Sequence, residues 1–546
     1  MNVCRSLLFL RPVAAVAALL GSLASAQAAG SPAARPNIVF ILADDLGVGD
    51  VKCFNPQGKI ATPQLDALAA RGRMFTEAHS SSAVCTPTRY NILTGRYNWR
   101  STRKSGVLGG FSPPLIEEGR LTVAELLHRQ GYHTAAVGKW HLGLEWARGP
   151  RTASSDPTPN KKAKGGAATL ENDDGGGIDF TKPFGRGPLT LGFDEYFGIS
   201  ASLDMPPYTF LEGDRAAVIP DHAGAFPMKN AHPDGGNVRT GPIAPGFDTI
   251  GVLPALTQRA VAIIGRQAAD ARAGKPFFLY LPLNSPHTPI APTKEWQGKS
   301  GLNDYADFVM QTDAAIGEIM AALEKSGVAD DTLVIVTSDN GCSPQADYPF
   351  LASRDHDPSA GRRGHKADIF DGGHRIPLIM RWPARIAAGS RSDAFVCLGD
   401  FMATCADILG TKLPANAAED SISFLPLLLG RAAPAPRDTL VLHSINGSFG
   451  IRQGRWKLEL CPDSGGWSFP RPGRDKTDGL PRFQLYDLET DPAEKANVVA
   501  DHPDVVQRLG RLMRAYVVNG RSTPGPPQQN TPVPRWPQTA WMDDFK

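Results

Sequence analysis

The sequence predicts an α/β fold: a large doubly wound, mixed but mainly parallel sheet flanked by helices, and a smaller C-terminal antiparallel sheet with a helix. Three observations lead to this prediction. Continuous apolar runs of strand length alternate with capped helical segments through most of the chain. The last part of the chain changes to short strand-like pieces. The 546 residues also exceed what one hydrophobic core usually organises, which favours two domains.

The first predicted strand is PNIVFILADDLG, residues 36–47. It is apolar until it ends in two carboxylates, which is typical of a strand buried on both faces of a parallel sheet. A helix is predicted at 62–72, with Thr62 as the N-cap and Pro63 at the first helical position.

The same order of elements recurs further along the chain. A helix at 121–131 begins with a capping box formed by Thr122 and Glu125, and a strand follows at 133–138. Because strands alternate with helices in this way, the sheet is predicted to be doubly wound.

Two later strands, 276–283 and 331–339, enclose a predicted helix at 305–327. The segments 152–187 and 462–484 interrupt the pattern. They are rich in glycine and proline together with polar or charged residues, so we expect both to be surface insertions.

The C-terminal part has its own pattern. After about residue 415 the pieces DTLVLHS, FGIRQGRWKLEL and FQLYDL read as short strands, and a helix is expected near HPDVVQRLGRLMRAYVV. The predicted organisation is therefore a leader at 1–28, an α/β domain at 29–415 and a smaller α+β domain at 416–546.

The leader reads as a cleavable secretory signal peptide. It carries Arg5 and Arg11, then an apolar run around 13–20 and small residues suited to cleavage. The alternative, an N-terminal membrane anchor, needs about 20 apolar residues. We expect a secreted or periplasmic protein with no membrane span.

Charge and cysteine content exclude two other classes. Without the leader the chain has 55 basic and 55 acidic residues, which gives no sign of a nucleic-acid partner. Six cysteines then remain, too few for a disulfide scaffold. If Cys397 and Cys405 share one helix, they lie about 12 Å apart along its axis and cannot pair. With Cys85 set aside for chemistry, at least one further cysteine is unpaired.

Polar residues at the predicted strand ends are the first candidates for a site. Ligands of open α/β sheets bind beyond the carboxyl ends of the strands. Asp44 and Asp45 end the first strand, and Asp339 and Asn340 end another. This all-oxygen set suits Ca²⁺ or Mg²⁺. Either pair alone is more simply interpreted as turn and cap residues, but the two pairs together favour a metal site.

Cys85 is the second candidate. In SSSAVCTPTRYNILTG, Pro87 fits the first turn of a helix, which puts Cys85 at the positive N-terminal end. Arg89 then lies on the same helical face as Cys85. The motif is short, and its simpler interpretation is a buried cysteine beside a surface arginine.

Lysines and histidines complete the candidate set. Lys139 and His141 share a face if the strand continues through them, and such a pair binds anions and moves protons. His287 follows another strand end in a proline-fixed loop. The loop GHKADIFDGGHRIP offers four further groups, among which spacing alone does not choose: His365, Lys366, His374 and Arg375.

Taken together, these segments resemble one family, the formylglycine-dependent, arylsulfatase-like type I sulfatases of the alkaline phosphatase superfamily. VCTPTRYNILTG resembles the first family signature and GYHTAAVGKWH the second. DDLG, SPHTP, TSDNG and the loop with Lys366 occur in the family's order, so the resemblance covers about residues 36–500.

The resemblance implies a cofactor set and a partner. Cys85 would be oxidised to formylglycine (3-oxoalanine) by a formylglycine-generating or other sulfatase-maturing enzyme. One Ca²⁺ would be bound by Asp44, Asp45, Asp339 and Asn340 together with the oxygen of modified residue 85.

The resemblance also implies a mechanism. One hydroxyl of the hydrated aldehyde attacks the sulfur of a sulfate ester, and Arg89 keeps that hydroxyl oriented. Lys139, Lys366 and His287 hold the sulfate oxygens, and His287 or Lys366 protonates the leaving oxygen. His141 takes the proton from the second hydroxyl, which releases sulfate.

Two positions depart from the family's usual residues: Thr88 replaces a frequent Ser, and Asp371 replaces a frequent Glu. The expected substrate is a sulfated carbohydrate or an aryl sulfate, with four candidates for contacts beyond the sulfate: Asp204, Tyr208, His443 and Asn446. The alternatives are a phosphate or phosphonate ester hydrolase of the same superfamily and, if Cys85 is unmodified, a non-catalytic glycan-binding protein.

Overall fold

The structure of the protein is a computed structural model that describes residues 35–149, 175–228, 236–431 and 437–546. The predicted signal peptide, residues 1–28, and residues 152–174 of the first predicted insertion lie outside the described residues. The described residues all belong to one structural unit, which begins at Arg35.

A ten-stranded mixed sheet is the centre of the fold, and its middle strands, from β13 to β5, run parallel. Antiparallel pairings extend it at both ends, and the outermost strand β15 pairs parallel with β2. This confirms the predicted mixed, mainly parallel sheet. In sheet order the strands are β15 Ser390–Ser392, β2 Arg73–Phe75, β14 Leu378–Arg381, β13 Thr332–Ser338, β1 Asn37–Asp44, β12 Phe277–Pro286, β4 His133–Lys139, β5 Glu195–Ile199, β6 Leu211–Glu212 and β7 Arg215–Ala216.

Strand β1 explains why the apolar runs are continuous. All of its residues are buried, because successive side chains enter two different cores. Val39, Ile41 and Ala43 belong to one core, whereas Ile38, Phe40 and Leu42 belong to the other.

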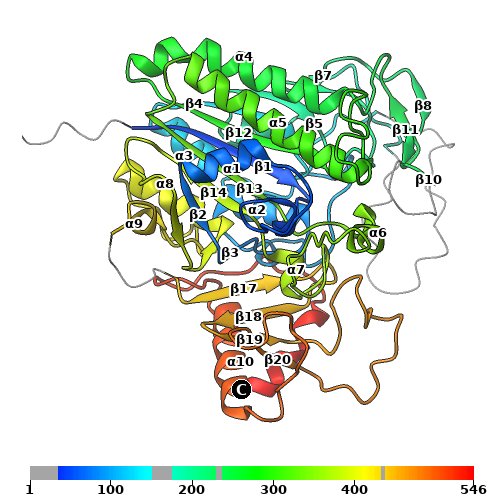
Figure 1. Ribbon diagram of the computed structural model, residues 1–546, viewed down its shortest axis with the longest axis vertical. Helices are drawn as coiled ribbons and strands as arrows, with labels where there is room; N and C mark the ends of the chain where they lie inside the picture. Colours follow the sequence, from blue (N-terminus) through cyan, green and yellow to red (C-terminus); the bar gives the residue numbers. More distant parts are fainter. Residues whose placement is uncertain (1–34, 150–174, 229–235, 432–436) are drawn as a thin grey trace, which may run out of the picture. The chain divides into compact units, whose positions relative to one another are not determined.

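Helices cover both faces of this sheet, as a doubly wound fold requires. The core on one side includes residues of α1 (Pro63–Ala70), α4 (Val252–Arg272) and α5 (Asp304–Lys325). Figure 1 shows α4 and α5 packed side by side. The core on the other side includes residues of α2 (Cys85–Thr94), α3 (Val123–Arg129), α8 (Phe401–Leu409) and α9 (Leu425–Leu428).

The predicted helix starts are correct in place but not in every detail. Thr122 caps α3 by accepting the Glu125 N–H at 3.1 Å, while the Glu125 carboxylate binds Arg129 instead of closing the capping box. The Thr62 side chain makes no cap bond to α1. Instead, Asp313 from α5 accepts the N–H groups of the first turn.

One helix is shorter than expected. Cys397 lies in the short strand β16 (Val396–Cys397), which pairs with β3 (Ala78–His79), and α8 begins only at Phe401. Cys397 and Cys405 are therefore not on one helix. All six described cysteines are free thiols.

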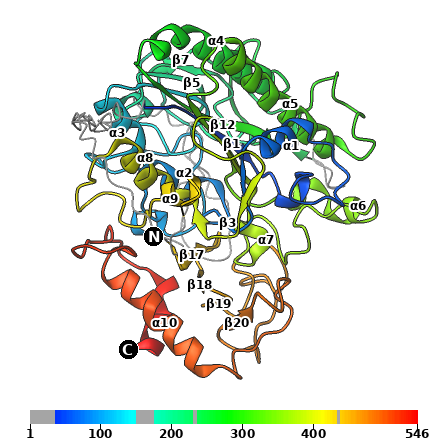
Figure 2. The same ribbon diagram turned by 60° about the vertical axis from the view of Figure 1, so that its left-hand side comes forward.

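The predicted C-terminal sheet is present. It is antiparallel, in the order β17 (Thr439–His443), β18 (Phe449–Gln453), β19 (Trp456–Glu459), β20 (Gln484–Asp487). Helix α10 (Pro503–Val518) contributes to the same core and lies beside these strands in both views (Figure 2).

The segment 462–484 is only in part a surface insertion. Its first residues pack on the loop that carries Lys366: Ile369 donates to the Ser464 carbonyl at 2.8 Å, and Trp467 donates to Asp368 at 2.7 Å. The remaining short elements are β8 His222–Gly224, β9 Pro227–Met228, β10 Gly236–Asn237, β11 Gly241–Ile243, α6 Tyr348–Ala352 and α7 Asp371–His374. Within the described ranges, no helix is both long and apolar enough to cross a membrane.

Candidate active site

The four predicted oxygen ligands meet at the carboxyl edge of the sheet. Strands β1 and β13 are neighbours, so the residues that follow them lie together. The Asp45 N–H donates to Asp339 Oδ1 at 3.2 Å, and Asn340 Nδ2 donates to Asp45 Oδ1 at 2.7 Å. Asp44 and the other three side chains are fully buried. Asp45 has a φ of 65°, in the left-handed region that Asp adopts more readily than most other non-glycine residues.

Two of these buried side chains keep an oxygen that has no donor. Asp44 Oδ1 and Asn340 Oδ1 lack any hydrogen-bond partner. One ligand atom each from Asp44, Cys85 and Asp339 lies within 4.8 Å of the others. Buried oxygens without donors are costly unless a cation binds them. The donor set therefore fits a hard cation such as Ca²⁺ or Mg²⁺.

Three basic side chains enclose the acidic group. Arg89 donates to Asp339 Oδ2 through Nε at 3.0 Å and Nη2 at 2.8 Å. Lys139 Nζ donates to Asp44 Oδ2 at 2.6 Å, and Lys366 Nζ donates to Asp45 Oδ2 at 2.7 Å. The site thus joins anions suited to a metal with cations suited to an oxyanion.

The charges at the site shift the pKa values of Asp44 and Asp339 in opposite directions. Burial by itself raises the pKa of Asp44, but Lys139, His287 and Arg89 outweigh it and hold that pKa below its usual range. Burial and the neighbouring Asp44 charge raise the pKa of Asp339. This repulsion between the carboxylates is what a bound divalent cation would relieve.

Cys85 is the first residue of α2 and is buried beside this acidic group. Burial raises the pKa of its thiol, against the opposing effect of Lys139 and Lys366. The sulfur is therefore a neutral thiol near neutral pH rather than the thiolate that the helix N-terminus alone would favour.

His141 reaches the site by a turn rather than along the strand. β4 ends at Lys139 and His141 has a φ of 57°, so the expected alternation on one extended face is wrong. Its Nε2 faces the Leu108 carbonyl at 2.7 Å and so carries the proton, which leaves Nδ1, without a partner, as an acceptor. Burial, Lys139 and Arg89 lower the pKa of His141 well below its usual value.

His287 is held in the complementary tautomer. Its Nδ1 lies 2.6 Å from the carbonyl oxygen of Thr288 and donates to it. Its Nε2 then faces Asp45 Oδ2 at 3.6 Å. Burial and Lys366 lower the pKa of His287, against the opposing effect of Asp45.

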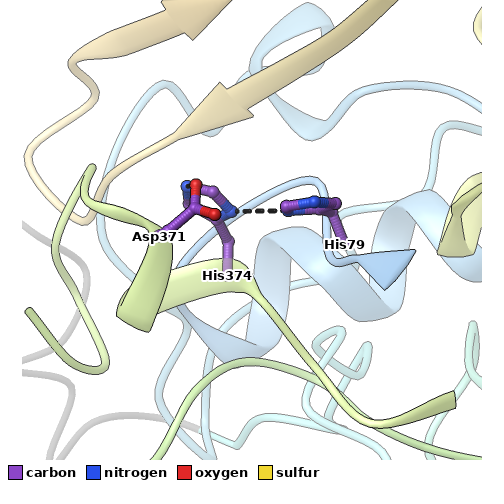
Figure 3. A group of neighbouring side chains, drawn as sticks. All are labelled: His79, Asp371 and His374. Carbon is purple, nitrogen blue, oxygen red and sulfur yellow. Dashed lines mark hydrogen bonds and ion pairs between the residues drawn. The ribbon is translucent and has the colours of Figure 1, made fainter. Parts of the chain in front are cut away.

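The loop that carries Lys366, residues 363–375, is called here the lysine loop. His365 turns from the acidic group to the Lys366 carbonyl and Ser468. His374 lies in a separate buried cluster with His79 and Asp371, where the two Nδ1 atoms are 3.0 Å apart (Figure 3). Arg375 pairs with Glu77 and Asp371.

The four expected contacts beyond the sulfate have different surroundings. Tyr208 is buried, and its hydroxyl donates to the Arg239 carbonyl at 2.5 Å. His443 is 1% exposed and packs against the Phe449 ring, so it does not lie at an open rim. Asn446 Oδ1 accepts hydrogen bonds from Ser444 and Ser448. Asp204 Oδ1 is buried and lacks a partner.

Sequence reasoning missed three buried polar side chains near this edge. Ser200, Ser202 and Asn284 have no side-chain hydrogen-bond partner. Ser200 accepts the His141 N–H through its carbonyl, and Asn284 lies near the end of β12, three residues before His287. Asn284 was recognisable as a polar residue at a strand end, whereas the serines follow a strand, β5, that periodicity did not identify.

Comparison with known proteins gives a consistent result. The sulfatase family model matches residues 36–411. The N-acetylgalactosamine-6-O-sulfatase of Bacteroides thetaiotaomicron is 33% identical over 521 residues, covering 89% of this chain and 94% of that protein. Human arylsulfatase A is 32% identical over 513 residues, 90% of each protein.

A solved structure agrees with these relatives. It comes from work on glycosaminoglycan metabolism by Bacteroides thetaiotaomicron, is 31% identical, and superposes with a TM-score of 0.73 over 88% of this chain and 99% of that chain. The protein described here therefore belongs to the sulfatase family and is a sulfuric ester hydrolase.

Proposed function

We propose that the protein hydrolyses a sulfated carbohydrate with a formylglycine at position 85 and one Ca²⁺, held by Asp44, Asp45, Asp339 and Asn340. One observation carries this proposal: buried oxygens without donors, three basic side chains and Cys85 converge at the N-terminus of α2. The formylglycine supplies a hydrated aldehyde whose hydroxyl is the nucleophile, and Ca²⁺ supplies positive charge that favours its ionised form.

The basic side chains bind the sulfate group in this proposal. Lys139 and Lys366 each hold one aspartate oxygen and are fixed by burial, so their ammonium groups are already placed for the sulfate oxygens. Positive charge fixed in a buried site stabilises the charge that develops on those oxygens. Arg89 keeps Asp339 in place and orients the first residues of α2 through its bond to the Lys139 carbonyl.

Two histidines, together with Lys366, transfer the protons of the reaction in this proposal. His287 carries its one proton on Nδ1 when the ring is neutral, so its Nε2 gives a proton to the leaving alcohol oxygen only after the ring has taken up a second proton. Lys366, whose ammonium already carries protons, shares this role. His141 Nδ1 is an acceptor without a partner and takes the proton that must leave residue 85 when sulfate is released.

The substrate class follows from relatives. The Bacteroides relative is an N-acetylgalactosamine-6-O-sulfatase, and that name favours a 6-O-sulfated amino sugar for this chain. The signal peptide predicted at 1–28 supports a location outside the cytoplasm for this enzyme.

The substrate is tested by comparing kcat/KM for sulfated monosaccharides and oligosaccharides, including N-acetylgalactosamine 6-sulfate, with an aryl sulfate and an aryl phosphate. We expect sulfate esters to be preferred and a sulfated sugar to be the best of them. A preference for the aryl phosphate would favour the phosphate or phosphonate ester hydrolase instead. No desulfation of any sugar would contradict the carbohydrate assignment.

The nucleophile is tested by mass spectrometry of the peptide that contains residue 85. Conversion of the CH₂SH group to CHO lowers the mass by about 18 Da, the change expected for the activated nucleophile. Cys85→Ala is the matched control and is expected to be inactive. An unmodified thiol in fully active enzyme contradicts the proposal, and an unmodified thiol in inactive protein supports the glycan-binding alternative.

A further inference from the structure

We infer that Lys457, on strand β19 of the C-terminal sheet, is a positioning residue that sets the place of Lys366 in the active site. This inference rests on the sulfate-binding role proposed above for Lys366. Lys457 lies in the strand-like piece FGIRQGRWKLEL, outside the predicted site residues, and makes no contact with the acidic group. It acts through the backbone and one carboxylate of the lysine loop.

The ammonium of Lys457 is fully buried and fully used. It donates to the Ile369 carbonyl at 2.9 Å, to Asp371 Oδ1 at 3.1 Å and to Glu494 Oε1 at 2.6 Å. An ammonium has three protons, so these three acceptors account for all of them, and His374 Nε2 lies at a longer 3.2 Å. Two of the three acceptors belong to the lysine loop.

Glu494 also binds the lysine loop directly, at two of its residues. Its Oε2 accepts the Asp371 N–H at 2.7 Å, and its backbone carbonyl accepts Arg363 Nη1 at 2.9 Å. The ion pair between Lys457 and Glu494 therefore lies between the start and the end of the lysine loop.

A short stretch of chain joins these anchors to the active site. Lys366 lies three residues before Ile369, and its own N–H donates to the Cys342 carbonyl at 2.9 Å. The next residue, Ala367, donates to the carbonyl of Ala83 at 2.8 Å, two residues before Cys85. A shift of Ile369 and Asp371 would move Lys366 and the segment that leads into α2.

His79, Asp371 and His374 form a nearby cluster with the composition of a metal site (Figure 3). Positive charge is already supplied to this cluster by side chains of the protein. Lys457 Nζ lies 3.2 Å from His374 Nε2 in addition to its bond with Asp371. Two arginines, Arg375 at 3.6 Å and Arg452 at 3.9 Å, face Asp371 Oδ2. Lys457 thus takes the place that a cation would have.

Removal of this ammonium would leave carboxylates facing one another in the interior. Asp371, Glu459 and Glu494 are all buried, and each lies within 3.2 Å of Lys457 Nζ. Buried carboxylates that lose their partner charge are strongly destabilised and separate or take up protons. Of these three residues, Asp371 is on the lysine loop, so the loop is what moves.

The test is a double-mutant cycle with Lys457→Met and Lys366→Ala, measured as kcat/KM per folded molecule on an aryl sulfate. In the wild-type background we expect Lys457→Met to lower kcat/KM about 10- to 100-fold, as misplacement of a charged catalytic group does. In the Lys366→Ala background we expect a further loss of less than about 3-fold, because the residue through which Lys457 acts is gone.

The matched control is Arg437→Met. Arg437 is a buried cation in the same C-terminal part, paired with Asp400, and none of its described contacts is on the lysine loop. We expect it to lower the unfolding temperature and to leave kcat/KM within about 2-fold in both backgrounds, as an independent site does. If Lys457→Met does not fold, Glu494→Gln takes its place in the cycle. We expect Glu494→Gln to lower kcat/KM by a smaller factor, and this loss should likewise disappear in the Lys366→Ala background.

The outcomes separate this inference from the proposed function. Equal losses from Lys457→Met in both backgrounds overturn the positioning role and leave the proposed function intact. Full activity of Lys366→Ala alone overturns the sulfate-binding role of Lys366, on which the inference rests.

Discussion

At the scale of single residues, the oxygens without donors at Asp44 and Asn340 make a direct prediction about metal removal. We expect EGTA to abolish activity and lower the unfolding temperature, and added Ca²⁺ to restore both. A ligand at 100 times its Kd stabilises the folded state by about 2.7 kcal/mol, so the shift is measurable by differential scanning fluorimetry.

Asp339→Asn is expected to lose this response to EGTA. Asp313→Asn is the control and is expected to keep it, because Asp313 is a buried carboxylate of α5 that accepts N–H groups from the start of α1. An unfolding temperature and activity that both ignore EGTA would contradict a Ca²⁺ site.

His443 predicts how stability depends on pH. Burial, with a contribution from Lys104, lowers the pKa of this histidine from 6.5 to about 3 in the folded state. Above pH 6.5 the residue is neutral in both the folded and the unfolded state, so it does not change the free energy of unfolding. As the pH falls below 6.5, only the unfolded chain takes up the proton, so stability is lost down to about pH 3.

At about pH 5 the loss attributable to this one group is about 2 kcal/mol. Between pH 7 and pH 5 the free energy of unfolding should therefore fall by about 2 kcal/mol less in His443→Phe than in the wild type. Urea denaturation at the two pH values measures this difference. His222→Phe, at an exposed histidine, is the control and should follow the wild type. Parallel pH curves for His443→Phe and the wild type would refute this account.

At the scale of elements, the packing of α10 predicts that the effect of one substitution on stability depends on a neighbouring side chain. A Cβ at Gly510 would lie 2.2 Å from the Phe545 ring. Gly510→Ala gains about 1 kcal/mol of helix propensity, but forcing the ring aside costs about 1–3 kcal/mol, so we expect net destabilisation in chemical denaturation. In a Phe545→Ala background the same change should be neutral or stabilising. Destabilisation in both backgrounds would show that the ring is not the cause.

At the scale of the whole molecule, the C-terminal part completes the catalytic part. The His443 carbonyl accepts the N–H of Ala83, and Ile445 donates to the carbonyl of Ala367 in the lysine loop at 3.0 Å. Arg100 pairs with Asp420 in a fully buried contact at 2.8 Å. We therefore expect the parts on either side of the predicted boundary near residue 415 to depend on each other for folding.

We accordingly expect a chain that ends at residue 415 to be insoluble or inactive, because these buried partners are lost. Soluble expression, circular dichroism and aryl sulfatase activity are the measurements. The matched control is a chain with a short deletion within 472–478, a largely exposed stretch, which should stay folded. An active chain ending at 415 would contradict this prediction.

The pattern of residues along the chain explains why the central strands and many of the candidate site residues could be predicted. The apolar run at 37–43 has no stable place except between two cores, so its residues indicate a central parallel strand. Asp44 and Asp339 follow such strands, and the rule for ligand sites at strand ends brings them together. Cys85, Lys139 and Lys366 were recognised through the family signatures that surround them, since spacing alone left several alternatives open.

The sequence by itself determined the α/β class, the two-sided burial of the central strands, and which side chains carry charge near the site. Only the tertiary structure decided the hydrogen-bond partners, because each depends on residues far apart in the chain. The His141 turn, the neutral Cys85 thiol and the contacts of Lys457 with Ile369 and Asp371 have no local signal. They arise when strands and loops from opposite ends of the chain exclude water from one another.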